Sequence, residues 1–125
     1  MRLLIDTHVF LWAVQGSASL KADARRIMTE AEQIYVSAAS IWEIAIKARL
    51  GKIEVDPKAL VEAISGSGFF ELPVRGTHAA GVAELPLLHS DPFDRVLLAQ
   101  AIAEPLKLLT ADPVLAQYSD LVTLI

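Results

Sequence analysis

The 125-residue sequence contains no cysteine, which excludes disulfide scaffolds, thiolate nucleophiles and cysteine-based zinc sites. It also lacks the run of about 18 apolar residues that a membrane span requires. An acid, Asp6, follows the N-terminal methionine too closely for the apolar core of a signal peptide. We therefore expect a cytoplasmic protein that makes no contact with a membrane.

Positive charge is scarce as well, because 11 Lys and Arg stand against 15 Asp and Glu, giving a net charge of −4. This balance argues against a protein that coats nucleic acid non-specifically, although it leaves room for a local basic groove. A composition of 54% hydrophobic and 21% charged residues excludes a disordered chain. With no internal repeat or linker, residues 1–125 are expected to form one domain.

Short apolar segments alternate with segments of helical periodicity along the whole chain. Strands are predicted at residues 3–5, 34–36, 69–74, 106–109 and 121–124. Helices are predicted through residues 9–13, 20–31, 41–50, 57–64, 77–85 and 92–102, with a short one after Asp112-Pro113. This alternation predicts an α/β fold in three layers, α/β/α, with a central and mainly parallel sheet.

The ends of the helices carry their own signals. Ser19 is expected to cap the helix that follows it, and Gly51 to end the helix before it. Asp56-Pro57 and Asp91-Pro92 each combine an acidic cap with a proline in the first turn.

Four acids follow the predicted strands: Asp6, Glu43, Asp94 and Asp112. In a parallel sheet the carboxyl ends of the strands share one edge, so these side chains are expected to meet there. Grouped carboxylates repel one another unless a cation lies between them. Oxygen ligands without cysteine favour Mg²⁺ or Mn²⁺.

Each acid also has a structural alternative. Glu43 fits a capping box with Ser40 or an ion pair with Lys47, and Asp94 suits the positive end of a helix. Three acids stand where an N-cap is expected: Asp6, Asp91 and Asp112. Capping does not require acids from neighbouring strands to share one edge, so their joint placement favours a site.

Several segments of the sequence are similar to one known family. They are Leu4-Ile5-Asp6-Thr7-His8, Ser40-Ile41-Trp42-Glu43-Ile44, His89-Ser90-Asp91-Pro92-Phe93-Asp94-Arg95 with Leu98-Ala99-Gln100-Ala101, and Thr110-Ala111-Asp112. In this order they resemble the PIN-domain ribonucleases of the VapC toxin type over essentially the whole chain. The resemblance implies a PIN fold, metal-dependent endoribonuclease activity and neutralisation by a VapB-like antitoxin.

The resemblance also implies a catalytic and metal-binding set, which is Asp6, Glu43, Asp94 and Asp112, with Mg²⁺ or Mn²⁺ as the cofactor. Asp91 is an alternative to Asp94, but Asp91 precedes a proline and is the better structural cap. Thr110 is a candidate helper close to the metal or a bound water.

Basic and apolar surfaces complete the expectations. Lys47, Arg49 and Lys52 lie on or just after the helix of Glu43 and are predicted RNA phosphate contacts. Arg95 is expected to pair with an acid, and the histidines to pack or hydrogen-bond. The helical stretches at residues 10–14 and 20–27 are candidates for an antitoxin groove or a homodimer face, unless they are all core.

Two other functions compete with the nuclease. A degenerate PIN domain would bind RNA or protein without cleaving, which the retained acids oppose. A receiver-type phosphoryl-transfer domain would need adjacent acids after the first strand, yet Asp6 stands alone there, and the late Lys107 falls at the start of a strand.

Overall fold

The computed structural model describes all residues, 1–125, and contains one five-stranded sheet. Its strands are β1 (Arg2–Ile5), β2 (Gln33–Ser37), β3 (Phe70–Leu72), β4 (Lys107–Thr110) and β5 (Val122–Leu124). They lie in the order β3-β2-β1-β4-β5, and each neighbouring pair is parallel. The predicted parallel sheet is confirmed, and its strands all end at one edge.

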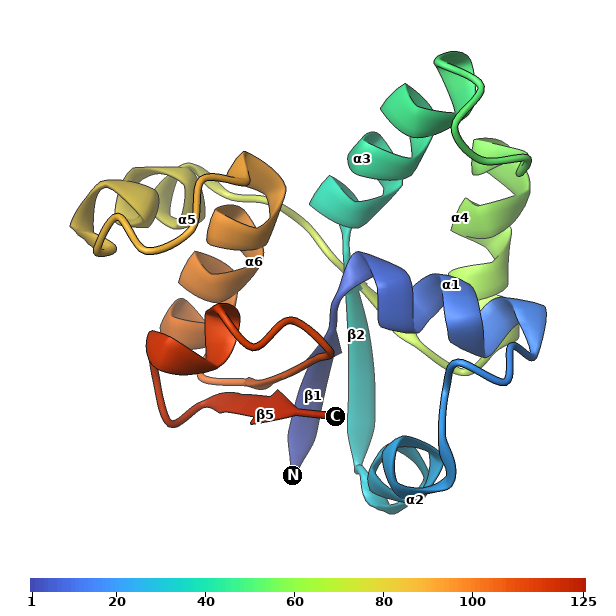
Figure 1. Cartoon of the computed structure of the whole chain (residues 1–125), viewed down its shortest axis with the longest axis horizontal. Helices are drawn as coiled ribbons and strands as arrows, with labels where there is room; N and C mark the ends of the chain where they lie inside the picture. Colours follow the sequence, from blue (N-terminus) through green and yellow to red (C-terminus); the bar gives the residue numbers. More distant parts are fainter.

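Helices cover both faces of the sheet, as the alternation of elements predicted (Figure 1). They are α1 (Thr7–Gln15), α2 (Ala22–Glu30), α3 (Ala38–Arg49), α4 (Pro57–Gly66), α5 (Gly76–Gly81) and α6 (Pro92–Ala103), with 3₁₀ segments at Val82–Glu84 and Leu115–Gln117. In Figure 1, α5 and α6 lie to the left of β1 and β2, whereas α1, α2 and α4 lie to the right. α3 leaves the end of β2 and contacts α1, α4 and α6. No helix combines the length and the apolar character needed to cross a membrane.

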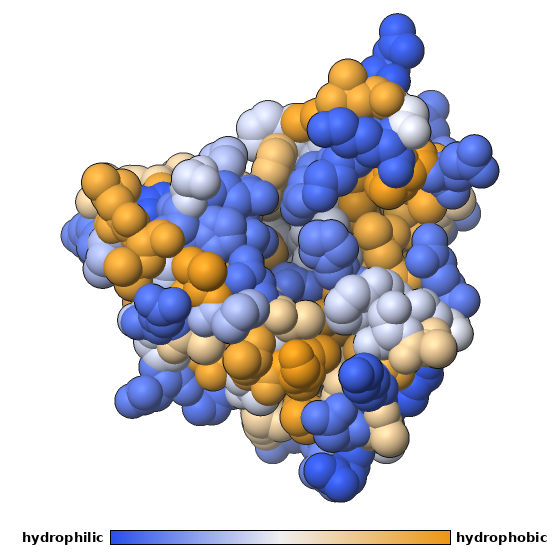
Figure 2. Space-filling view, in the orientation of Figure 1, coloured by the Kyte–Doolittle hydropathy of each residue, from blue (hydrophilic) through white to orange (hydrophobic).

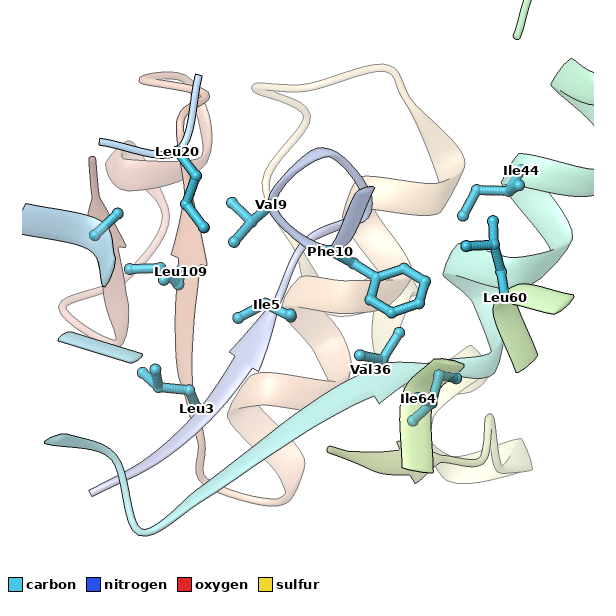
Figure 3. Packing of buried hydrophobic residues seen from close by; sticks show 11 residues of the cluster. Leu3, Ile5, Val9, Phe10, Leu20, Val36, Ile44, Leu60, Ile64 and Leu109 are labelled. Atoms are coloured by element: carbon cyan, nitrogen blue, oxygen red, sulfur yellow. The ribbon is translucent and has the colours of Figure 1, made fainter. Parts of the chain in front are cut away.

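The strands divide their side chains between two cores, because successive residues of a strand point to opposite faces. Leu3 and Ile5 of β1 pack with Phe10 in the core beneath α1 and α4 (Figure 3). Leu4, between them, packs with Leu98 in the core beneath α6. Burying such a side chain stabilises the fold by about 1.5–3 kcal/mol. The two cores therefore fix the register of β1 and the point at which it ends.

Several predicted helix boundaries are confirmed. The carboxylates of Asp56 and Asp91 accept hydrogen bonds from the backbone N–H groups of Lys58 and Phe93, at the starts of α4 and α6. A proline stands in the first turn of each helix. Gly51 follows α3 with a φ of +74°, the left-handed conformation that glycine adopts without a Cβ clash.

One predicted cap is wrong, and one alternative capping arrangement does not form. Ser19 does not cap α2, whose N-cap is Lys21 with no side-chain hydrogen bond. Ser40 and Glu43 do not form a capping box, because the Ser37 hydroxyl one turn earlier accepts an N–H of α3 and the Glu43 carboxylate turns elsewhere.

Two predicted elements have different lengths. The strand expected over residues 69–74 is limited to β3, since Pro73 has no N–H to continue the ladder. The helix expected over residues 77–85 changes from α5 to a 3₁₀ turn at Val82 and ends before Pro86. Neither change alters the topology.

Candidate metal centre

The candidate site lies where β1 and β4 end side by side. Asp6 follows β1 directly, and its backbone N–H donates to the Leu109 carbonyl at 3.1 Å. Thr110 is the last residue of β4, and Asp112 lies two residues further on. After β1 the chain enters α1 over one core, whereas after β4 it enters the 3₁₀ turn of Leu115 over the other. Such a divergence of neighbouring strands opens a crevice at the sheet edge.

Asp6 is both a helix cap and a member of the acidic cluster. Its Oδ1 accepts the Val9 N–H at 2.9 Å, and its Oδ2 accepts the Thr110 hydroxyl at 2.6 Å. Burial raises the pKa of Asp6, and the hydrogen bonds from Thr110 and Val9 oppose that rise. Thr110 also accepts the backbone N–H of Asp112 at 3.0 Å. Thr110 therefore ties Asp6 to the turn that carries Asp112.

Glu43 is buried in α3, and both of its carboxylate oxygens have protein partners. The Thr7 hydroxyl donates to Oε1 at 2.8 Å, and the Lys47 ammonium donates to Oε2 at 2.6 Å. The hydrogen bond to Glu43 raises the pKa of Lys47. The predicted ion pair with Lys47 is thus present, and it orients the acid.

The two acids at the start of α6 have different surroundings. Asp91 is the N-cap, and its Oδ1 accepts the N–H groups of Phe93 at 2.8 Å and Asp94 at 3.4 Å. The Asp94 carboxylate lies apart from the cap, with its Oδ2 3.2 Å from His89 Nε2. Burial, followed by the negative charges of Asp91 and Asp6, raises the pKa of Asp94 to about 7. Asp91 is therefore the N-cap of α6, and Asp94 is the acid whose pKa depends on the neighbouring carboxylates.

Asp112 is joined to His89, a residue that the sequence reasoning assigned only to packing or hydrogen bonding. Asp112 Oδ1 accepts the Val114 N–H at 2.9 Å, and its Oδ2 lies 2.8 Å from His89 Nε2. Burial acts to raise the pKa of Asp112, but the hydrogen bonds from His89 and Val114 outweigh it and lower the pKa. One ligand atom from each of His89, Asp94 and Asp112 lies within 4.8 Å of the others. The sequence feature that could have indicated this role is the position of His89 two residues before the capping Asp91.

Three of the four acids, Asp6, Asp94 and Asp112, meet at an open pocket of about 280 Å³. Its lining residues are Asp6, His8, Trp12, Asp94, Ala111 and Asp112. Glu43 does not line the pocket, but its charge raises the pKa of both Asp6 and Asp94. Figure 2 shows a hydrophilic hollow in the middle of this face, between α6 and α3. The four predicted acids are therefore gathered at one edge of the sheet.

The chemistry of these donors suits a divalent cation. Carboxylate oxygens are the ligands that Mg²⁺ and Mn²⁺ prefer. Acids crowded in a half-buried pocket repel one another unless a cation or a proton intervenes, and this repulsion adds to burial in raising the pKa of Asp94.

The predicted basic residues do not line the acidic pocket. Lys47 pairs with a buried acid, whereas Arg49 and Lys52 are exposed at the far end of α3. The expected pairing of Arg95 with an acid is wrong. Its guanidinium is buried and donates instead to backbone carbonyls between residues 82 and 89.

A parallel sheet between two helix layers, with acids gathered at the ends of β1 and β4, defines an α/β domain that carries a candidate metal centre at its sheet edge. Residues 3–121 match the PIN domain family, and the chain belongs to that family. The predicted resemblance to PIN domains is confirmed. No curated protein matches the chain.

Solved structures share the fold over nearly the whole chain. VapBC2 from Rickettsia felis, bound to a promoter DNA fragment, superposes with a TM-score of 0.72 at 16% identity, covering 100% of this chain and 98% of that one. A toxin–antitoxin complex from Klebsiella pneumoniae gives 0.69 at 17% identity, covering 97% and 95%. VapC20 of Mycobacterium tuberculosis gives 0.62 at 14% identity, covering 94% and 97%. At these identities the likeness shows the fold alone.

Proposed function

We propose that this protein is a cytoplasmic, metal-dependent endoribonuclease that hydrolyses RNA phosphodiester bonds as the toxin of a toxin–antitoxin pair. The Asp94 carboxyl carries the proposal, because it caps no helix, lines one pocket with Asp6 and Asp112, and has a pKa raised to about 7 by burial and neighbouring acids. Membership of the PIN family supports a nuclease. One protein of the same fold is described as a toxin that cleaves the Sarcin-Ricin loop, which supports RNA as the substrate.

In this proposal the catalytic acids Asp6, Glu43, Asp94 and Asp112 hold Mg²⁺ or Mn²⁺. When bound, such an ion acidifies a water molecule and offsets negative charge on the phosphate. Two of these acids are already oriented by hydrogen bonds within the chain. Thr110 orients Asp6, while Thr7 and Lys47 orient Glu43. With its pKa raised to about 7, Asp94 would be partly protonated near neutral pH and would give up that proton if a cation were bound.

The RNA backbone needs positive charge close to the acidic pocket. Lys47 is half-exposed one helical turn from Glu43, and Arg49 and Lys52 extend the basic surface along α3. We propose these three residues as phosphate contacts. Replacing Arg49 and Lys52 together by alanine is expected to raise KM and leave kcat unchanged, measured at fixed salt.

The test of the nuclease is an incubation of the purified protein with total RNA, with Mg²⁺ or Mn²⁺ and with a chelator. We expect discrete cleavage that requires the ion, and mapping of the cut ends then defines the target. RNA or protein binding without metal-dependent cleavage would instead support the degenerate PIN domain.

The antitoxin is proposed to dock as an amphipathic helix along α1 and α2. Phe10 and Leu20 of the expected groove belong to the core, so this part of the prediction is wrong. Half-buried Ala13 remains available, and with Met28, which lies just beyond the expected stretch of residues 20–27, it lines a groove between the helices. The toxin–antitoxin complexes of the same fold support this type of partner. Met28→Arg should abolish co-purification with an antitoxin encoded beside the gene while preserving RNA cleavage.

A second copy of the chain is the proposed occupant of an apolar pocket of about 390 Å³ between α3, α5 and α6. Trp42 is 64% exposed beside it and packs edge-on against Phe93, with ring centroids 5.0 Å apart. Monomeric proteins rarely leave such a patch in water, and a twofold contact would cover it on both copies. Sedimentation analysis should show a dimer that Trp42→Glu converts to a monomer.

A further inference from the structure

His89 occupies a position among the acids that the proposed reaction leaves without a role. Its Nδ1 accepts the backbone N–H of Asp91 at 3.0 Å, so this nitrogen carries a lone pair and no proton. In the neutral ring the proton is therefore on Nε2. Nε2 lies 2.8 Å from Asp112 Oδ2 and 3.2 Å from Asp94 Oδ2. The ring thus donates toward both carboxylates.

This tautomer is the wrong one for a metal ligand. A histidine that binds an ion through Nε2 needs its lone pair there and a proton on Nδ1, which would then face the Asp91 N–H as a second donor. The hydrogen bonds instead make His89 a donor that bridges Asp94, in the first turn of α6, and Asp112, after β4. Metal-binding carboxylates commonly depend on such outer donors for their orientation.

The backbone around His89 is held by polar contacts. The Tyr118 hydroxyl accepts the backbone N–H of His89 at 2.6 Å and that of Leu88 at 3.0 Å. Buried Arg95 donates to the Pro86 carbonyl at 2.9 Å, and its Nη1 lies 3.3 Å from the Tyr118 hydroxyl. Apolar packing contributes little here, since Leu88 is 49% exposed. Tyr118 and Arg95 therefore set where the imidazole stands.

We propose that His89 is a positioning residue, fixed by Tyr118 and Arg95, that holds Asp94 and Asp112 in the geometry the divalent ion requires. The inference rests on the proposed metal-dependent function and adds a residue outside its four acids. His89 acts through the two carboxylates and does not itself contact the ion.

The test measures Mn²⁺ affinity by calorimetry and Mn²⁺ coordination by pulsed EPR, on the full chain. His89→Ala should weaken Mn²⁺ binding about tenfold, while His89→Gln, whose amide nitrogen can stand in for Nε2, should retain most of the affinity. Cleavage by His89→Ala should recover toward the parent rate at saturating Mn²⁺. The EPR spectrum of the parent should show no directly bound imidazole nitrogen.

Tyr118→Phe tests whether the support acts through His89. It should weaken Mn²⁺ binding a few-fold, and the Tyr118→Phe, His89→Ala double variant should bind no worse than His89→Ala alone, because the two effects share one route. Tyr35→Phe is the matched control, since the Tyr35 hydroxyl donates only to Gln33 on β2.

The outcomes separate the two proposals. A parent that binds no Mn²⁺ overturns the metal-dependent function and this inference with it. If His89→Ala and Tyr118→Phe both bind Mn²⁺ as tightly as the parent does, the proposed function stands and the positioning role of His89 is overturned. A bound imidazole nitrogen in the EPR spectrum makes His89 a ligand and overturns the positioning role, and additive losses in the double variant refute the link to Tyr118.

Discussion

The acidic centre has an inner pair, Asp6 and Glu43, and an outer pair, Asp94 and Asp112, and the two pairs are held differently. Asp6 and Glu43 are each 4% exposed, and all their carboxylate oxygens accept hydrogen bonds from the protein. Asp94 and Asp112 are half-buried, and their shared side-chain partner is His89. Protein donors favour the charged form of a buried acid and oppose the rise in pKa that burial causes, as at Asp6, whereas Asp94 has few donors.

This difference identifies Asp94 as the outer acid whose protonation should change near neutral pH. Asp112 has donors on both oxygens and a lowered pKa, whereas Asp94 faces other acids and has a pKa raised to about 7. Contacts between distant segments hold both pairs, since Thr110 donates to Asp6, Thr7 donates to Glu43 and His89 lies against Asp112. The outer pair is the more exposed of the two, so a metal ion should act most directly there.

The largest expected effect is the loss of cleavage in Asp94→Asn. The amide removes a charged ligand at the point where the acids converge, and we expect RNA cleavage to fall by about three orders of magnitude. Asp120→Asn is the matched control, because Asp120 is exposed and outside the pocket. An Asp94→Asn enzyme that keeps a tenth of the parent activity would show that the inner pair suffices.

Metal binding should stabilise the folded chain. An ion that binds only the folded state adds about 2.7 kcal/mol at a hundred times its Kd, so thermal unfolding followed across a Mn²⁺ titration should shift steadily upward. Asp6→Asn removes an inner ligand and should abolish the shift. If parent and variant melt alike at every Mn²⁺ concentration, the cluster is not a metal site.

Without metal, acidification should stabilise the protein. Asp94 has a folded pKa of about 7 against 3.8 unfolded, so the folded state binds the proton more tightly. This contribution is complete below the unfolded pKa and is lost as pH rises through the folded one. In chelator, Asp94 should make the free energy of unfolding about 2 kcal/mol higher at pH 5 than at pH 8, and Asp6, whose pKa burial also raises, should act in the same direction. Asp94→Asn should lose most of that difference, and an equal slope in both proteins would contradict the assignment.

Two substitutions of Asp6 separate its role as a helix cap from the effect of its buried charge on the stability of the fold. Asp6→Ala deletes the acceptor for the Val9 N–H and should cost about 1–2 kcal/mol. Asp6→Asn keeps an oxygen for that bond and removes a buried charge, so it should unfold at nearly the parent urea concentration in chelator. Equal losses in the two variants would mean that the charge, and not the cap, stabilises α1.

The sequence carried enough local signal to predict the sheet and the four acids. Short apolar runs such as residues 3–5 mark strands buried on both faces, and the acid directly after such a run must lie at the sheet edge. Asp-Pro pairs mark helix starts, which is why the cap at Asp91 could be distinguished from Asp94. The PIN-type segments identified the same acids independently.

What could not be predicted depends on partners distant in the chain. His89 is brought to Asp112 by a tyrosine 29 residues away in sequence and by the buried Arg95, whose carbonyl partners have no sequence signature. For the same reason Arg95, beside an acid in sequence, was wrongly expected to pair with one. The Ser40 capping box failed because Ser37, one turn earlier, ended β2 at the position of the cap.

The smallest effect, and the sharpest test of the outer pair, is expected from Asp91→Asn. Asparagine caps a helix about as well as aspartate, so stability at pH 5 should change by only a few tenths of a kcal/mol, whereas Asp91→Ala should cost about 1 kcal/mol. The substitution removes the negative charge that, after burial, does most to raise the pKa of Asp94. In chelator, the midpoint of the pH-dependent loss of stability should therefore move down and remain above 3.8. An unchanged midpoint would show that the charge of Asp91 does not act on Asp94, and a midpoint near 3.8 would show that burial and the other acids contribute nothing.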